Sequence, residues 1–155
     1  VLTDYYEERA YEAASRFGAM AVGLDEIYDQ DVDIYSPCAL GATINDDTIG
    51  RLKCRVIAGC ANNQLARENE HGPELVRRGI VYAPDFLINA GGLINVYSEV
   101  VGTSRQGALA QTEKIYDYTL QVLDRAEQEN SHPQAAAIRQ AQERIEAVGK
   151  VKSTY

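Results

Sequence analysis

The chain has 155 residues, of which 45% are hydrophobic and 25% charged, a balance typical of one folded domain and not of a disordered chain. No apolar run approaches the ~18 residues of a membrane-spanning helix and the start resembles no signal peptide, so we expect no membrane partner. The net charge of -8, most of it in residues 1–35, and the lack of a basic stripe argue against nucleic acid as a partner.

Short apolar runs alternate with polar, helix-like stretches over the first two thirds of the chain. Strands are predicted at residues 1–3, 19–22, 33–38, 55–59 and 79–84, and a helix over residues 6–17 that Gly18 ends. Strands separated by helices predict an α/β fold with a parallel sheet. Right-handed crossovers bring all strand carboxyl ends to one edge of such a sheet, which is where ligands bind.

The last third of the chain has helical periodicity only. Apolar residues repeat at alternating spacings of four and three over residues 105–126, which predicts a long amphipathic helix. A turn follows, and Pro133 is suited to the first position of a final helix, which we expect Gly149 to end.

The three cysteines, Cys38, Cys54 and Cys60, are odd in number and form no Cys-x-x-Cys motif. Neither a disulfide framework nor a zinc site is predicted, since His71 and His132 lie far from any ligand-like spacing. The cysteines suit a reducing cytoplasm and are expected to be small buried hydrophobes. Cys38 is the exception that stays open, because it lies at the end of a strand.

Two segments at the predicted sheet edge could bind a nucleotide. Asp4 follows the first strand, where a carboxylate can bind ribose hydroxyls and repel the 2′-phosphate of NADP, although it could equally cap the following helix. Residues 37–42 (PCALGA) are small enough for close approach of a ligand to the backbone, although a tight turn would explain them as well.

Two further segments carry amides at the same edge. Asn62, Asn63 and Gln64 follow the strand at 55–59, and amides suit a carboxamide, a ribose or an amino acid; turn-forming asparagines are the alternative. Asn89 precedes two glycines and an apolar helix, which gives exposed N–H groups beside a polar side chain, or simply an ordinary helix start.

Several catalytic signatures are missing from the sequence. There is no Gly-x-Gly-x-x-Gly, no P-loop and no plausible Ser-His-Asp or Cys-His arrangement. Dehydrogenation of an amine needs a tuned lysine or carboxylate, and the lysines (Lys53, Lys114, Lys150 and Lys152) do not fall on the predicted edge. No catalytic residue is therefore assigned.

Three strings, residues 35–45 (YSPCALGATIN), 53–65 (KCRVIAGCANNQL) and 79–92 (GIVYAPDFLINAGG), resemble the C-terminal NAD-binding domain of the glutamate/leucine/phenylalanine/valine dehydrogenase family. CALG and ANNQL resemble its leucine/phenylalanine/valine branch. The resemblance covers nearly the whole chain and implies reversible oxidative deamination of a branched-chain or aromatic L-amino acid to the 2-oxo acid and ammonia, with NAD as hydride acceptor.

The resemblance also implies an organisation. Residues 1–104 would form a Rossmann-type doubly wound sheet that starts at its second strand, and residues 105–155 a helical extension packed on it. The catalytic lysine and aspartate and the glycine-rich fingerprint would precede Val1, so we expect these 155 residues alone to be inactive. The full-length protein would be a homo-oligomer.

Site roles follow from the resemblance residue by residue. Cofactor binding is assigned to Asp4, Cys38, Ala39, Leu40, Asn62 and Asn89. The substrate pocket is assigned to Asn62, Leu93 and Val96. The sequence departs from the family pattern at Cys60, where serine is common, at Leu93, where the leucine-specific enzymes tend to have valine, and at Gln134, where a small hydroxyl residue is usual.

Two other interpretations stay open. The chain could be a truncated, non-catalytic nucleotide-binding or oligomerisation module. It could also be a different nucleotide-binding protein with a similar half-Rossmann layout, in which case a preference for NADP would contradict the role given to Asp4.

Overall fold

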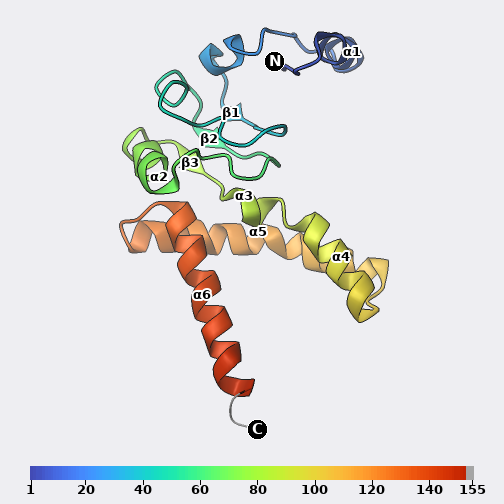
Figure 1. The fold of residues 1–155 in the computed structure, drawn as a ribbon, viewed down its shortest axis with the longest axis vertical. Helices are drawn as coiled ribbons and strands as arrows, with labels where there is room; N and C mark the ends of the chain where they lie inside the picture. Colours follow the sequence, from blue (N-terminus) through green and yellow to red (C-terminus); the bar gives the residue numbers. More distant parts are fainter. Residues whose placement is uncertain (153–155) are drawn as a thin grey trace.

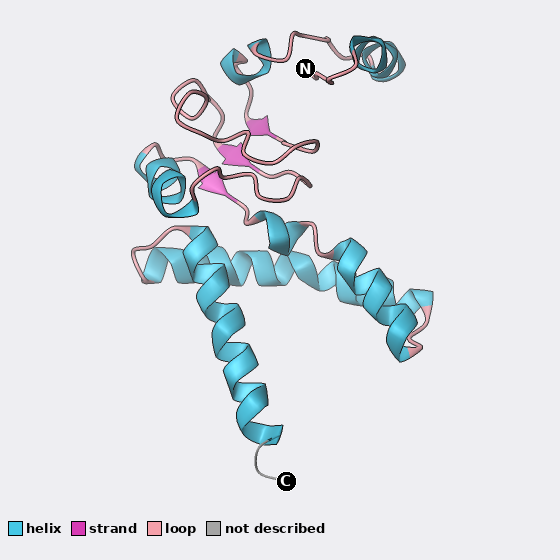
Figure 2. Ribbon diagram, in the orientation of Figure 1, coloured by secondary structure: helices cyan, strands magenta, loops and turns pink. Residues whose placement is uncertain are grey.

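The computed structural model describes residues 1–152 as an α/β arrangement of a small parallel sheet and helices, with the helices dominating (Figures 1 and 2). The elements run in the order α1 (Glu7–Phe17), the 3-10 helix η1 (Glu26–Asp29), β1 (Ile34–Tyr35), β2 (Val56–Ile57), α2 (Glu68–Arg77), β3 (Val81–Tyr82), α3 (Asp85–Ile88), α4 (Gly91–Val101), α5 (Arg105–Gln128) and α6 (Pro133–Lys152). None of the helices within residues 1–152 is long and apolar enough to span a membrane.

The sheet has the strand order β1-β2-β3 and is parallel throughout, as predicted. Ile34 pairs with Val56, and Val56 in turn with Val81, so the three strands are in one register. Each strand is shorter than predicted, and β1 and β3 end ahead of Pro37 and Pro84, which cannot donate to a neighbouring strand.

The first two predicted strands do not join this sheet. Within residues 1–152 they are paired only with each other, through one parallel bridge between Leu2 and Ala21. The helix between them begins at Glu7 and ends at Gly18, whose φ of 63° is the left-handed conformation that glycine adopts readily. This amino-terminal part lies beyond the β1 edge of the sheet (Figure 1).

The core is divided into two clusters. The larger one surrounds the sheet and contains Tyr35, Ile44, Ile49, Leu52, Cys54, Ile57, Leu65, Leu75, Ile80 and Tyr82. The smaller one lies where α5 meets α6 and contains Val122, Ala126, Ala136 and Ala137, with Leu87 of α3 packed against it. Helix α5 packs against α3, α4 and α6, and α6 also contacts α2 (Figure 1).

The final helix is longer than predicted. It begins at Pro133, as expected, but passes through Gly149 and continues to Lys152. Glycine weakens a helix interior by about 1 kcal/mol without preventing it, so Gly149 is not a stop here. Residues 153–155, which the predicted extension over 105–155 includes, lie outside the described residues.

Candidate functional site at the carboxyl edge of the sheet

The loops that follow β1, β2 and β3 meet at the carboxyl edge of the sheet. The first two are held together by their main chains: the Ala42 N–H donates to the Asn63 carbonyl at 2.7 Å, and the Ile44 N–H to the Gln64 carbonyl at 3.0 Å. Gly41 lies inside this contact, since a Cβ there would come within 2.7 Å of the Asn62 carbonyl oxygen. A side chain at this position would force the two loops apart.

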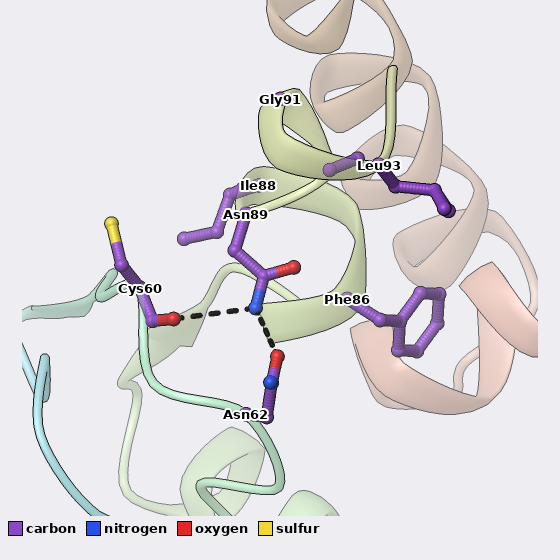
Figure 3. Close-up of a pocket in the computed structure, with 8 residues that line it drawn as sticks. Cys60, Asn62, Phe86, Ile88, Asn89, Gly91 and Leu93 are labelled. Atoms are coloured by element: carbon purple, nitrogen blue, oxygen red, sulfur yellow. Dashed lines mark hydrogen bonds between the residues drawn. The ribbon is translucent and has the colours of Figure 1, made fainter. Parts of the chain in front are cut away.

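Two asparagines form the centre of the edge. The Asn89 Nδ2 donates to the Asn62 Oδ1 at 2.5 Å and to the Cys60 carbonyl oxygen at 3.3 Å (Figure 3). These bonds use the amino group of Asn89 and leave its Oδ1 as an acceptor and the Asn62 Nδ2 as a donor. The pair thus offers one donor and one acceptor without net charge.

A buried carboxylate fixes the third loop beneath this pair. The Asn63 N–H and the Tyr82 hydroxyl both donate to Asp85, the hydroxyl at 3.4 Å. Burial, and then the negative charge of Asp85, raises the pKa of the Tyr82 phenol far above its ordinary value. Asp85 therefore joins the end of β3 to the loop after β2.

An open hollow of about 650 Å³ lies beside the amide pair. It is lined by Cys60, Asn62, Phe86, Ile88, Asn89, Ala90, Gly91 and Leu93 (Figure 3). Apolar side chains from α3 and α4 face polar groups from the loop after β2. This combination suits a ligand that has both a flat or apolar part and an amide-like or hydroxyl-bearing part.

The structure brings several of the predicted site residues together. Asn62, Asn89 and Leu93 share the hollow, as expected of one site. Cys38, Ala39 and Leu40 are exposed on the adjoining loop after β1. The pKa of the Cys38 thiol lies below its ordinary value because the Cys60 N–H, and then the Ser36 hydroxyl, stabilise the thiolate.

Other predicted residues lie apart from the hollow. Val96 is exposed on α4 and is not among the lining residues. Asp4 lies just before α1, where its Oδ1 accepts a hydrogen bond from the Tyr6 N–H at 2.8 Å. This bond matches the capping alternative, although the helix begins with Tyr6 as its N-cap.

Two residue expectations are corrected by the structure. Gln64 is fully buried, and its Nε2 donates to the Gly59 and Ala61 carbonyls at 2.7 and 2.9 Å, so it braces the loop and does not face a ligand. Cys60 was expected to be buried but is exposed. The regular pattern of the sheet ends after Gly59, where the Ala61 N–H, and not that of Cys60, donates to the Pro37 carbonyl.

Asp85 and Phe86 are the parts of the edge that sequence reasoning did not single out. The available signal was their place directly after the proline that closes β3. Within residues 1–152 no group of three His, Cys, Asp or Glu side chains is placed to hold a metal ion.

The family model for glutamate/leucine/phenylalanine/valine dehydrogenase matches residues 3–152. The leucine dehydrogenase of Thermoactinomyces intermedius is 51% identical over all 155 residues, which cover 42% of that protein. The crystal structure of L-tryptophan dehydrogenase from Nostoc punctiforme superposes with a TM-score of 0.90 at 43% identity, over 96% of this chain and 44% of the other.

The fold likeness extends further than the sequence likeness. The hetero-hexameric glutamate dehydrogenase of Thermus thermophilus has a TM-score of 0.70 at 19% identity, over 96% of this chain and 38% of the other. At this identity the likeness shows the fold alone. In each of these comparisons the chain spans less than half of the relative's length.

Proposed function

Because the chain belongs to the glutamate/leucine/phenylalanine/valine dehydrogenase family, we propose that these 155 residues supply the NAD-binding part of an amino-acid dehydrogenase. The reaction is the reversible oxidative deamination of a branched-chain or aromatic L-amino acid to the 2-oxo acid and ammonia. The observation that carries the proposal is the uncharged amide pair, Asn62 and Asn89, beside an open hollow at the carboxyl edge of a parallel sheet.

The chemistry of the amide pair fits the nicotinamide end of NAD. A carboxamide has one donor group and one acceptor, which match the Asn89 Oδ1 and the Asn62 Nδ2. NAD supplies the acceptor of the hydride when it is bound. The role of this chain is to orient the cofactor: Asn89 and Asn62 hold the nicotinamide end, while Cys38, Ala39 and Leu40 form the wall that the dinucleotide passes.

The adenosine end is assigned to Asp4, whose carboxylate binds ribose hydroxyls and disfavours a 2′-phosphate. The carboxylate keeps one oxygen for this role, since only Oδ1 accepts the Tyr6 N–H. Residues 1–104 then act as a Rossmann-type unit and the helices of residues 105–155 as an extension that packs on it through α5.

Leu93 and Val96 on α4 are proposed to line the pocket for the substrate side chain, and Asn62 is proposed to contact the reacting amino acid. Leu93 lines the hollow and is 74% exposed, so it is available for contact with an apolar ligand. One additional methylene group in such a pocket changes discrimination by only about 1–3 kcal/mol. A pocket with so little discrimination is compatible with either a branched-chain or an aromatic amino acid.

The group that moves the proton is proposed to come from outside these residues. Among the lysines whose side chains the structure describes, Lys53, Lys114 and Lys150, none lines the hollow. The 155-residue chain is therefore expected to bind NAD without turning over leucine. A measurable NAD-dependent oxidation of leucine by this chain alone would contradict that division of roles.

Calorimetric titration with NAD and NADP tests the binding proposal. We expect NAD to bind more tightly than NADP, and Asn62→Ala to weaken NAD binding by about fivefold, since each hydrogen bond contributes ~1 kcal/mol. Asn95→Ala is the matched control, because Asn95 is exposed on α4, does not line this hollow and donates its side-chain Nδ2 to Glu99 at 3.4 Å. A preference for NADP, or equal losses in the two variants, would overturn the proposal.

A further inference from the structure

Two of the three cysteines lie exposed on neighbouring loops of the sheet edge. Cys38 follows β1 and Cys60 follows β2, while Cys54 is buried in the core below them. Cys38 and Cys60 are 22 positions apart in the sequence, so they do not form a Cys-x-x-Cys motif. Their proximity comes entirely from the pairing of the strands.

The register of β1 and β2 places the two cysteines opposite each other. Ile34 pairs with Val56 and Tyr35 with Ile57, and the same register extended along both chains pairs Cys38 with Cys60. Neighbouring strands lie about 4.8 Å apart, and paired residues in parallel strands point to the same face. This separation falls inside the range of about 4.4–6.8 Å between Cα atoms that a disulfide requires.

The hydrogen bonds beyond the strands confirm that the two chains stay together as far as the cysteines. The Ala58 N–H donates to the Tyr35 carbonyl at 3.1 Å, and the Ala61 N–H to the Pro37 carbonyl at 3.0 Å. The second bond is shifted by one residue, since Cys60 would be the donor in a regular sheet. The Cys60 N–H instead contributes to lowering the pKa of the Cys38 thiol.

The backbones at this point are unusually close. A Cβ on Gly59 would lie 2.1 Å from the Pro37 carbonyl oxygen, so the residues that precede the two cysteines are in direct main-chain contact. The Ser36 Oγ lies 3.4 Å from the Cys38 Sγ and forms part of the same cluster. The cysteines therefore belong to one packed unit and not to two independent loops.

We propose that Cys38 and Cys60 form a reversible oxidation site, in which hydrogen peroxide converts the two thiols into an intramolecular disulfide. The Cys38 thiol first loses its proton, its thiolate attacks one oxygen of the peroxide and the O–O bond breaks, and the released hydroxide combines with that proton to become water. The Cys60 sulfur then attacks the resulting sulfenic acid; the S–S bond forms and the S–O bond breaks. The second hydroxide takes the Cys60 proton, so two thiols are oxidised and one peroxide is reduced to two waters.

The surroundings decide which sulfur reacts first. A thiolate is a better nucleophile than a thiol. The Cys60 N–H and the Ser36 hydroxyl stabilise the thiolate of Cys38, so Cys38 attacks the peroxide first. Cys60 supplies the resolving thiol within reach. Cys54 is excluded from the exchange because it is buried, and burial raises the pKa of its thiol.

The disulfide would change the candidate nucleotide site, a consequence that rests on the proposed function. The Cys60 carbonyl accepts the second hydrogen bond of Asn89, and Cys60 itself lines the hollow. Drawing its side chain toward Cys38 turns this carbonyl and disturbs the amide pair. We expect NAD affinity to fall by about fivefold, the loss that accompanies one disrupted hydrogen bond.

Peptide mapping tests the oxidation site directly. Trypsin separates all three cysteines, because residues 17–51 contain Cys38, residues 54–55 contain Cys54 and residues 56–67 contain Cys60. After treatment with hydrogen peroxide and alkylation of the remaining thiols, we expect peptide 17–51 linked to peptide 56–67, and release of both by dithiothreitol. Cys54→Ala is the control that should still give the linked pair, whereas Cys38→Ser and Cys60→Ser should each abolish it.

Three outcomes would overturn the inference: alkylated Cys38 and Cys60 after oxidation, linkage through Cys54, or linkage only between two chains. Titration of the reduced and the oxidised chain with NAD separates this inference from the proposed function. If the disulfide forms but neither form binds NAD, the oxidation site stands and the proposed function fails. If both forms bind NAD equally, the site is not coupled to the cofactor.

Discussion

At the scale of single residues, Gly59 shows how the absence of a side chain positions the candidate site. Its backbone contacts that of Pro37, and the same contact sets the course of the loops that carry Cys38 and Cys60. Gly59 is buried at the end of β2, where no flexible side chain can move aside. Glycine at position 59 is therefore what allows the two main chains to approach so closely.

Gly59→Ala is expected to destabilise the fold by about 1–3 kcal/mol or more, the cost of overpacking a rigid contact. The added Cβ would lie 2.1 Å from a carbonyl oxygen, and a backbone atom cannot rotate away. Gly50→Ala is the matched control, since nothing lies within 4 Å of its Cβ position. Urea unfolding of both variants measures the difference, and equal midpoints would contradict the close contact.

The meeting of Asn62 and Asn89 could be anticipated because each follows a strand of one parallel sheet, and such strands end at a common edge. The direction in which the Gln64 side chain points could not be anticipated. Asn63 adopts a φ of 53°, which redirects the chain so that Gln64 points into the core. The sequence carries no signal for that conformation beyond the general tolerance of asparagine.

At the scale of elements, the joint between α2 and α6 illustrates packing that no periodicity reveals. The ring of His132 lies against Gly72 of α2, where a Cβ would come within 2.3 Å of its Nδ1. Within residues 1–152 this buried Nδ1 has no hydrogen-bond partner. Burial, and then the positive charge of Arg139, lowers the pKa of His132 below 6.5.

This joint makes stability depend on pH. Because the folded-state pKa of His132 is lowered, the unfolded chain binds the proton more readily, so the free energy of unfolding falls as pH drops below about 6.5. His132→Phe should reduce the loss measured by urea unfolding between about pH 7.5 and about pH 5.5. All other titrating groups are common to the two chains, so an equal loss in both would refute the assignment.

Helix and strand types were predictable wherever the pattern was long. The periodicity over residues 105–126 predicted α5, and the apolar runs predicted the three parallel strands. The ends of the elements were less predictable, since α6 passes through Gly149 and each strand is only two residues long. A terminus depends on small local energies, whereas the type of an element depends on a whole face of apolar residues.

At the scale of the molecule, many large apolar side chains remain exposed. Phe17 of α1, Leu93 and Val100 of α4, Tyr116 of α5 and Ile145 of α6 are each at least 69% exposed. The helices that carry them extend from α1 at one end of the arrangement to α6 at the other (Figure 1). Helix α4 alone exposes Leu93, Val96, Tyr97, Val100 and Val101, and a group of exposed apolar side chains of this size is characteristic of surfaces that contact other protein.

The 155-residue chain is therefore expected to self-associate, and to do so more strongly at high salt. The net charge of -8, to which residues 1–35 contribute nine acidic and two basic side chains, opposes association until salt screens it. Sedimentation velocity at several protein concentrations, in low and high salt, measures the effect. One sedimentation coefficient that is independent of both variables would contradict it.

The interlocked loops of the carboxyl edge have a consequence for how substrate preference can diverge. Their shape is set by main-chain bonds, such as those from Ala42 to Asn63 and from Ile44 to Gln64, which almost any side chain permits. Exposed positions such as Leu40 and Leu93 can therefore be exchanged without refolding the edge. The relatives named for leucine, tryptophan and phenylalanine are 51%, 46% and 48% identical to this chain, and side-chain exchange at such exposed positions leaves the main-chain bonds of the edge in place.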